Sequence, residues 1–409
     1  MQVVVIGAGL GGLCLAQGLK AAGVAVTVHE RDPSVGHRPQ GYRIHLDSRA
    51  ARALSECLPP RLYELFTTTS GQPSRRVTIV DEHLRELHAV RFGDGASGDA
   101  PETFNAAVDR MTLRTILLAG LDEVRFGAEF VRYEQDGGRV RAFFADGSTA
   151  AGDLLVGADG IGSRVRGQRL PQARVKDLGV RCLYGRTILD DRVAGLLPPA
   201  LTEGFMSVRS AGAGLALGLV RPRENPAEAA ARLWPGLRLD WAGDYVMWAL
   251  AVPAAALPGT DAELAAADGA RLHELAAGHV ASWHPDLVEL VASARADQTF
   301  YVPVRSSVPL KAWAPDNVTL LGDAVHAMSP AQGSGANCAL LDAALLCRAV
   351  GAGGPLVEAV GGYERKMTEL GFAAVRASER AADGGGLVAK ALAGLASRRR
   401  TRSRPSGGR

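Results

Sequence analysis

Three short segments far apart in the chain contain residue types whose spacing could support chemistry. Residues 7–12 read G-A-G-L-G-G, residues 157–160 read G-A-D-G, and residues 322–326 read G-D-A-V-H. The first has the G-x-G-x-x-G spacing of loops that hold a pyrophosphate. The other two place a carboxylate beside a glycine at the end of an apolar run. Together they predict a dinucleotide site, provided that the surrounding elements position them.

The glycine loop lies between a predicted strand and a predicted helix. An apolar run over residues 2–6 precedes it, a helical pattern over 10–20 follows, and a second strand over 25–29 ends at Glu30. A helix that begins at such a loop offers free N–H groups and the positive end of its dipole to phosphates. Glu30 stands where an acid accepts hydrogen bonds from ribose hydroxyls. This unit predicts a Rossmann-like site for FAD or NAD.

The middle segment is an apolar strand that runs into an Asp-Gly turn. Residues 154–156 are Leu-Leu-Val, and Asp159 and Arg166 follow them. Ligands of open α/β sheets bind at the carboxyl ends of strands, so these two side chains could reach a cofactor. They could equally cap the turn. The sequence leaves both roles open.

The late segment combines a strand end, a carboxylate and a helix start. Residues 318–321 form an apolar run, and Asp323 lies at its carboxyl end, where a carboxylate could hold the hydroxyls of a ribityl chain. A loop rich in glycine then leads into a helical pattern over residues 339–346. The positive end of that helix would favour the negative charge of a reduced flavin.

Taken together, the three segments resemble those of the single-component FAD-dependent aromatic hydroxylases with the para-hydroxybenzoate hydroxylase fold, the class A flavoprotein monooxygenases. The resemblance covers nearly the whole chain, and residues 322–337 match the family pattern closely, as does Asp342 in the following helix. It implies that Glu30 serves the ADP part of FAD, that Asp159 serves both FAD and NAD(P)H, and that Asp323 holds the ribityl chain.

Two further segments resemble parts of the same family. The Arg-x-x-Leu-x-x-x-Leu pattern that begins at Arg110 matches a helix whose arginine contacts FAD near its phosphates, and residues 38–46 match the strand beside the flavin. Alternation along that strand places Arg43 and His45 on one face, so both are candidates for contact with the flavin ring. The flavin would carry the chemistry, and no metal is expected. The predicted cofactor-binding residues are Gly7, Gly9, Leu10, Gly11, Gly12, Glu30, Arg31, Arg38, Arg110, Asp159, Asp323, Pro330, Gly333, Gly335 and Asn337.

The fold implied by the resemblance is α/β, with a Rossmann-like FAD-binding domain interleaved with a β-sheet substrate domain and followed by C-terminal helices. Residues 205–209, 215–221 and 245–252 are expected to be strands of the sheet that covers the flavin. The expected division is a FAD-binding domain of residues 1–69, 103–176 and 299–350, a substrate domain of 70–102 and 177–298, a helical segment of 351–397, and a basic, disordered tail of 398–409.

The composition is that of an ordinary globular protein and argues against other classes of function. Six arginines within residues 398–409 account for more than the whole formal net charge of +3, so no nucleic-acid-binding surface is expected on the folded body. The 5 cysteines form no C-x-x-C pair, which predicts free thiols. No apolar run is long enough to cross a membrane, and a strand begins almost at residue 1. We therefore expect a cytoplasmic monomer or homodimer without stable membrane insertion.

The function implied by the resemblance is monooxygenation with FAD, O2 and either NADPH or NADH. Reduced flavin would form a C4a-hydroperoxide with O2 and hydroxylate a hydrophobic, aromatic or polycyclic small molecule, as in secondary metabolism. Epoxidation and Baeyer–Villiger oxygenation would use the same fold. A flavin oxidase or a non-enzymatic flavin-binding protein is the alternative of a different class. The sequence does not separate these outcomes.

Large side chains on the expected sheet are candidates for the substrate pocket, although most such residues pack in a core. The phenol-binding tyrosines of the family have no clear counterpart here. This difference favours a bulkier hydrophobic substrate, such as a polycyclic polyketide. The candidates are Tyr184, Phe205, Met206, Met247, Trp248 and Tyr301.

Overall fold

The computed structural model describes residues 1–37, 41–92 and 100–383. Arg38 and the basic tail over 398–409 lie outside the described residues, as does the part of the predicted helical segment after residue 383. Within the described residues, no helix is both long enough and apolar enough to span a membrane.

A parallel sheet brings the three sequence motifs together. Its strand order is β17-β11-β1-β2-β7, with every neighbouring pair parallel. Gly7 follows β1, Asp159 follows β11 and Asp323 follows β17, and these strands are neighbours whose carboxyl ends meet at one edge. The bounds are β1 (Gln2–Ile6), β2 (Ala25–Glu30), β7 (Val124–Phe126), β11 (Leu154–Gly157) and β17 (Val318–Leu320).

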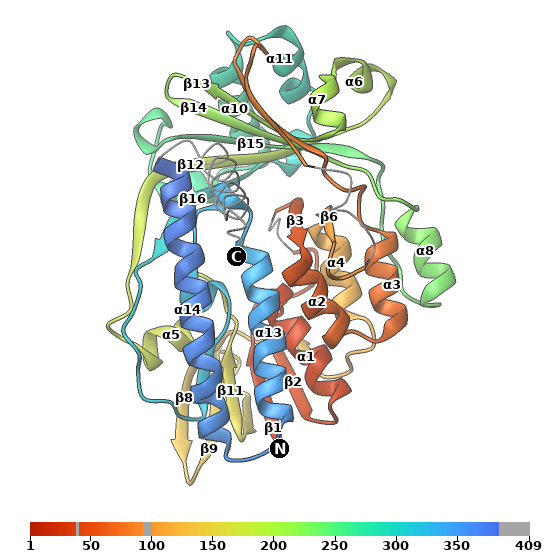
Figure 1. Ribbon diagram of the computed structural model, residues 1–409. Helices are drawn as coiled ribbons and strands as arrows, with labels where there is room; N and C mark the ends of the chain where they lie inside the picture. Colours follow the sequence, from red (N-terminus) through yellow and green to blue (C-terminus); the bar gives the residue numbers. More distant parts are fainter. Residues whose placement is uncertain (38–40, 93–99, 384–409) are drawn as a thin grey trace, which may run out of the picture.

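Helices and two small sheets surround the parallel sheet. Figure 1 shows α13 and α14 running side by side, and α1 packs against α13. The helices are α1 (Leu10–Ala21), α2 (Ser48–Cys57), α3 (Pro60–Thr68), α4 (Arg110–Leu118), α5 (Arg164–Arg169), α12 (Asp323–His326), the 3-10 helix η4 (Pro330–Gln332), α13 (Gly335–Gly351) and α14 (Leu356–Asp383). The small sheets pair β3 (Arg43–Asp47) with β6 (Asn105–Asp109), and join β8 (Phe130–Asp136), β9 (Arg139–Phe144) and β10 (Thr149–Gly152).

A second, larger sheet lies across one end of this assembly (Figure 1), and we call it the large sheet. Its order is β16-β12-β15-β14-β13-β4-β5. The strands are β4 (Arg76–Asp81), β5 (Glu86–Arg91), β12 (Val175–Ile188), β13 (Gly204–Ser210), β14 (Ala213–Val220), β15 (Tyr245–Pro253) and β16 (Phe300–Ser307). The remaining elements are α6 (Asp191–Leu196), α7 (Pro199–Thr202), α8 (Pro226–Leu233), η2 (Ala254–Ala256), α9 (Asp261–Ala266), α10 (Gly269–Val280), α11 (Pro285–Ala292) and η3 (Ala296–Gln298).

The two faces of the large sheet have different neighbours. The face toward α10 and α11 carries large apolar side chains that form a separate core, among them Leu215, Leu217 and Leu250. Because side chains alternate along a strand, the residues between these face the cofactor motifs. Met206 and Trp248 belong to the core face, and both side chains are fully buried. Of the six candidates for the substrate pocket, these two are therefore core residues and do not line the cavity.

The expected α/β fold, with a Rossmann-like domain, a separate sheet and C-terminal helices, is confirmed. The structure differs from the expected domain division at β16, because the expected FAD-binding domain includes residues 299–350. β16 pairs with β12 and is the edge strand of the large sheet. A single sequence gave no indication of this pairing, because it joins residues more than a hundred positions apart.

Candidate flavin and substrate site

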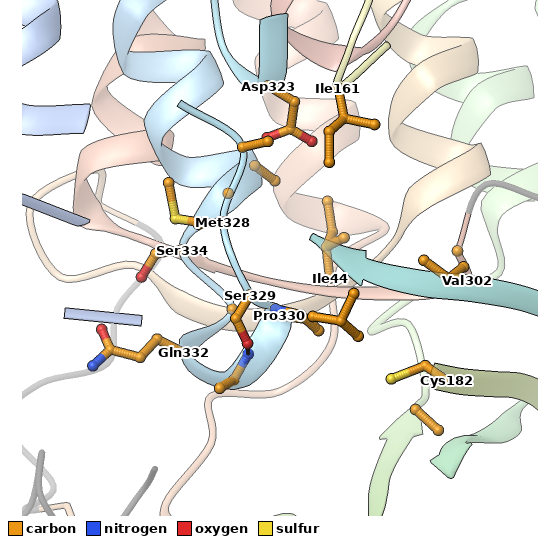
Figure 2. Close-up of a pocket in the computed structure, with 18 of the residues that line it drawn as sticks. Ile44, Ile161, Cys182, Val302, Asp323, Met328, Ser329, Pro330, Gln332 and Ser334 are labelled. Carbon is orange, nitrogen blue, oxygen red and sulfur yellow. Dashed lines mark hydrogen bonds between the residues drawn. The ribbon is translucent and has the colours of Figure 1, made fainter. Parts of the chain in front are cut away.

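One continuous cavity of about 1920 Å³ separates the carboxyl ends of the parallel strands from the large sheet. Pockets for one drug-sized ligand measure roughly 300–1,000 Å³. The cavity therefore has room for a dinucleotide and a second ligand. In Figure 2, Asp323 and Ile161 lie close together on one side, Ser329 and Pro330 lie on the loop before α13, and Cys182 and Val302 come from the large sheet.

The glycine loop contains two positions where the fold itself requires glycine, and one glycine that faces open space. Gly7 has a φ of +109°, and a Cβ there would lie 2.4 Å from the carbonyl oxygen of Ala158. A Cβ on Gly12 would lie 2.2 Å from the carbonyl oxygen of Gly7. By contrast, a Cβ on Gly9 would meet no atom of the described residues within 4 Å, and Gly9 lines the cavity. The space beside Gly9 fits a pyrophosphate, and no side chain caps the N-terminus of α1 there.

Glu30 is held in place from three directions. Its carboxylate accepts hydrogen bonds from the N–H groups of Ala8 (2.8 Å) and Asp32 (3.0 Å), and the Arg114 guanidinium lies 3.7 Å away. Arg114 also donates to the carbonyl oxygens of Ala8 (2.9 Å) and Val35 (2.7 Å). Glu30 still lines the cavity, so a ribose can reach the remaining lone pairs.

Arg114, which is completely buried, is not among the residues predicted from sequence. An available signal was its position one helical turn after Arg110, on the same helix. We expect the Arg114→Met variant to lose about 3 kcal/mol of unfolding free energy, because it leaves the buried Glu30 carboxylate without its cation. Chemical denaturation of the apoprotein measures this loss. A matched change at the exposed Arg132 should have no effect, and an equally stable Arg114→Met protein would contradict the assignment.

The middle motif caps a helix and joins two loops. Asp159 accepts hydrogen bonds from the N–H groups of Arg164 (2.9 Å) and Val165 (3.3 Å) at the start of α5, while its Oδ1 is buried without a partner. Arg166 donates to the carbonyl oxygens of Ala324 (2.9 Å) and Ile161 (2.7 Å). Through these two hydrogen bonds, the Arg166 side chain links the middle motif to the late motif. Asp159 caps α5, and its contact with a cofactor stays a prediction.

Asp323 presents a carboxylate to the cavity. Its side chain is open to the cavity and makes no hydrogen bond with any described residue. Desolvation raises the pKa of Asp323, while the charges of His326 and Arg110 oppose this rise. A carboxylate with all its acceptor sites vacant beside a glycine-rich loop suits a chain of hydroxyl groups, as in the ribityl part of FAD.

A buried ion pair anchors the late motif to α13. His326 and Asp342 are joined at 2.6 Å between Nε2 and Oδ2, and the same oxygen accepts the N–H of Gly322 at 3.0 Å. Both side chains are buried. Burial alone would lower the pKa of His326, but the attraction of Asp342 outweighs it and the pKa is raised. The pair fixes the turn that carries Asp323.

This ion pair predicts a pH dependence of stability. Because the folded-state pKa of His326 is raised, its stabilising contribution is complete below the unfolded value of about 6.5 and is lost as the pH rises through the folded value. We expect Asp342→Asn to lower the unfolding free energy by about 3 kcal/mol at pH 6 and by less at pH 9. Urea denaturation at both pH values tests this. A difference that grows with pH would contradict the prediction.

The N-terminus of α13 opens onto the cavity without a side-chain cap. Pro330, Gly333 and Gly335 line the cavity there, and their contact with FAD stays a prediction. Asn337 also lines it, but its amide bridges β3 and the loop. Asn337 accepts the N–H of Asp47 at 2.9 Å and donates to the carbonyl oxygens of His45 and Gly333. Its side chain is thus occupied, and direct cofactor contact by Asn337 stays a prediction.

The other described site candidates also line the cavity, so the structure brings the predicted set together. Gly11 differs from Gly9 in that a Cβ there would lie 2.4 Å from Leu321 Cδ2, which makes it a packing position. Direct contact of each of these site candidates with FAD stays a prediction. These candidates are Leu10, Gly11, Arg31, Arg43, His45 and Arg110.

The described residues fit FAD, since the vacant Asp323 carboxylate, the open space at Gly9 and two uncapped helix N-termini lie in one cavity. Among the pocket candidates, Tyr184, Phe205 and Met247 line the cavity on the large sheet. Tyr301 also lines it, but its hydroxyl donates to Asp261 at 2.5 Å.

Comparisons with known proteins agree with this geometry. The family model of a FAD binding domain matches residues 280–353, and that of an NAD(P)-binding Rossmann-like domain matches residues 5–57. The chain is 31% identical over 352 residues to 2-heptyl-3-hydroxy-4(1H)-quinolone synthase of Pseudomonas aeruginosa, with 85% of this chain and 80% of that protein covered. It is similar to the crystal structure of a putative FAD-containing monooxygenase from Photorhabdus luminescens, with 31% identity, a TM-score of 0.77, and 93% and 98% of the two chains covered.

A third relative is much longer than this chain. The dual O-methyltransferase/FAD-dependent monooxygenase CTB3 of Cercospora beticola is 33% identical over 390 residues, which covers 89% of this chain and 44% of that protein. The chain thus spans less than half the length of this relative.

The fold, the site and these relatives agree with one another, and the chain belongs to the class A flavoprotein monooxygenase family. The described residues of the site fit FAD as the cofactor of this family, and NAD(P)H and O2 fit the family as co-substrates.

Proposed function

We propose that this protein is an NAD(P)H-consuming hydroxylase that adds an oxygen atom from O2 to a planar, hydrophobic, aromatic or polycyclic small molecule of secondary metabolism. The observation that carries the proposal is a patch of small residues on the large sheet, across the cavity from the late motif. We call Gly214, Ala216, Ala249 and Ala251 the small-residue patch; all of them line the cavity.

The patch is flat and continuous because its members are cross-strand partners. Gly214 pairs with Ala251 and Ala216 pairs with Ala249, on the adjacent strands β14 and β15. Neighbouring strands lie about 4.8 Å apart, and alternate residues of one strand about 6.8 Å apart. No side chain larger than a methyl group stands on this area. Larger side chains lie around it, with Tyr184 opposite Ala249 on β12 and Phe205 on β13. Such a surface suits the face of a fused-ring molecule.

The chain's own residues would bind and shield the reactants. FAD, when bound, supplies the oxygen-activating chemistry. The large sheet covers the cavity and, with its core, excludes water from one side of it. The relative named 2-heptyl-3-hydroxy-4(1H)-quinolone synthase, whose name describes a hydroxylated bicyclic product, supports hydroxylation of a ring system.

The proposal is tested by oxygen consumption and product mass with a series of phenols of one to four fused rings. We expect NAD(P)H oxidation to be stimulated by the larger members, with one ¹⁸O atom from ¹⁸O2 in the product. The Ala216→Phe variant should lose stimulation by three- and four-ring phenols and retain FAD. The flavin absorbance of the purified variant is the internal control, because retained FAD shows that the protein is folded.

Other results of this experiment would indicate one of the alternative functions instead of hydroxylation. An epoxide or an inserted ester oxygen, identified by NMR of the product, would replace hydroxylation by epoxidation or Baeyer–Villiger oxygenation. Substrate-driven flavin reduction with peroxide and no need for NAD(P)H would indicate an oxidase. Absence of turnover with every compound and nucleotide would indicate a flavin-binding protein.

A further inference from the structure

One guanidinium in the cavity reaches from the FAD-binding domain to the large sheet. Arg43 is the first residue of β3. A Cβ built on Gly218 would lie 2.5 Å from Arg43 Cδ, and Arg43 Cζ lies 5.4 Å from the centroid of the Phe205 ring. Phe205 and Gly218 are cross-strand partners on β13 and β14. The arginine therefore packs against this pair and covers the glycine.

The Arg43 side chain makes neither a hydrogen bond nor an ion pair with any described residue. Its Nε is sealed from solvent without an acceptor, whereas its terminal nitrogens are not sealed and face the cavity that Arg43 lines. Other deeply placed arginines have partners: Arg166 donates to two carbonyl oxygens, and Arg181 pairs with Asp177 and Asp261. A desolvated cation without a partner is costly, and an incoming anion would remove that cost.

The charge of Arg43 is retained at neutral pH. Burial lowers its pKa to about 10, and the nearby Tyr245 opposes this shift. A pKa of about 10 leaves nearly all of the guanidinium protonated at pH 7. The cavity therefore contains a permanent positive charge that has lost most of its water.

Arg43 stands at the edge of the small-residue patch. Gly218, which the arginine covers, is two residues after Ala216 on β14 and is on the same face of the sheet. A planar molecule lying on the patch would thus present one edge to the guanidinium. The terminal N–H groups of arginine match the two oxygens of a carboxylate and also bind a phenolate.

We propose that Arg43 is the specificity-determining residue of this site and binds an oxyanion, a carboxylate or a phenolate, on the edge of the planar substrate. This inference rests on the proposed function, because it takes the small-residue patch as the place where the substrate lies. It narrows the substrate class to polycyclic acids and acidic phenols.

Two probes of equal shape and different charge test the inference by binding alone. Isothermal titration of the oxidised, FAD-loaded protein with 2-naphthoate and with 2-naphthamide requires no NAD(P)H and no turnover. We expect the wild type to bind the naphthoate at least about 10-fold more tightly, as for a charge-assisted hydrogen bond worth at least about 1.4 kcal/mol. Arg43→Gln should abolish the preference, and Arg43→Lys should keep part of it.

A third probe separates the two kinds of oxyanion. For 2-naphthol, affinity for the wild type should rise as the pH approaches the pKa of the naphthol, and should stay flat for Arg43→Gln. If naphthol affinity rises with pH and naphthoate is preferred over naphthamide, Arg43 binds both phenolates and carboxylates. If naphthoate is preferred but naphthol affinity does not rise, Arg43 binds carboxylates alone. The matched control is Arg192→Gln, which removes the same charge from an arginine paired with Glu289 on α11, and should keep the preference.

Equal affinity for 2-naphthoate and 2-naphthamide in the wild type would overturn the inference without any variant, as would undetectable binding of the naphthoate. A preference that survives in an FAD-loaded Arg43→Gln protein would also overturn it. Failure of the proposed function is recognised separately, as absence of substrate-dependent NAD(P)H oxidation, whatever the naphthoate preference.

Discussion

Replacement of Asp323 by asparagine is expected to weaken FAD binding about 100-fold and to leave the apoprotein at least as stable as the wild type. The carboxylate is open to the cavity without a hydrogen-bond partner among the described residues, and its pKa is raised by desolvation. Two hydrogen bonds from ribityl hydroxyls to a charged acceptor contribute about 3 kcal/mol, which corresponds to about 100-fold in affinity. Removing a desolvated charge costs the empty protein nothing. Fluorescence titration of the apoprotein with FAD and thermal unfolding measure the two effects.

The control for this experiment is Asp122→Asn. Asp122 is highly exposed and pairs with Lys20 on the surface, so the change in charge is the same and neither quantity should move. Loss of apoprotein stability in Asp323→Asn, with FAD affinity unchanged, would show that the carboxylate has a structural role and does not hold the cofactor.

The glycine loop gives the second large effect, in which two similar substitutions have opposite consequences. Gly9→Ala should keep the stability of the apoprotein, because its Cβ meets no atom within 4 Å in the part of the chain that the structure describes. It should weaken FAD binding at least about 10-fold by filling the space of the pyrophosphate. Gly12→Ala should cost about 3 kcal/mol of unfolding free energy, because its Cβ would lie 2.2 Å from a backbone oxygen.

Each variant is the control for the other when unfolding and FAD titration are measured on both. If the Gly9→Ala protein binds FAD like the wild type, the pyrophosphate does not lie in the space beside Gly9. A Gly12→Ala protein with unchanged stability would mean that the loop relaxes to admit the methyl group.

The meeting of the three motifs was predictable because each follows an apolar strand of a parallel sheet. The motif residues can be recognised from sequence: the glycines by their spacing, and Asp323 by its position after the apolar residues 318–321. The expected strands over 205–209 and 245–252 correspond closely to β13 and β15. Residues 261–280 form two helices, α9 and α10, because Asp268 caps a new helix by accepting the N–H of Arg271.

The substrate end of the cavity was much less predictable. Which face of a strand points into a cavity depends on pairing with distant strands, so Phe205 and Met206 could not be separated from sequence alone, although they lie on opposite faces. The alanines and glycines of the small-residue patch carry no chemical signal. The role of Arg114 depends on its contacts with Ala8 and Glu30, which only the fold reveals.

We infer that nicotinamide electrons reach a flavin that serves a planar substrate bound against the large sheet. This inference is tested most directly by anaerobic mixing of the FAD-loaded protein with NADPH or NADH, followed by absorbance at the flavin band, with and without three- and four-ring phenols. The account predicts that one nucleotide bleaches the flavin and that a polycyclic phenol accelerates bleaching in the wild type more than in Ala216→Phe. A flavin that neither nucleotide reduces, with every phenol tried, would contradict the account.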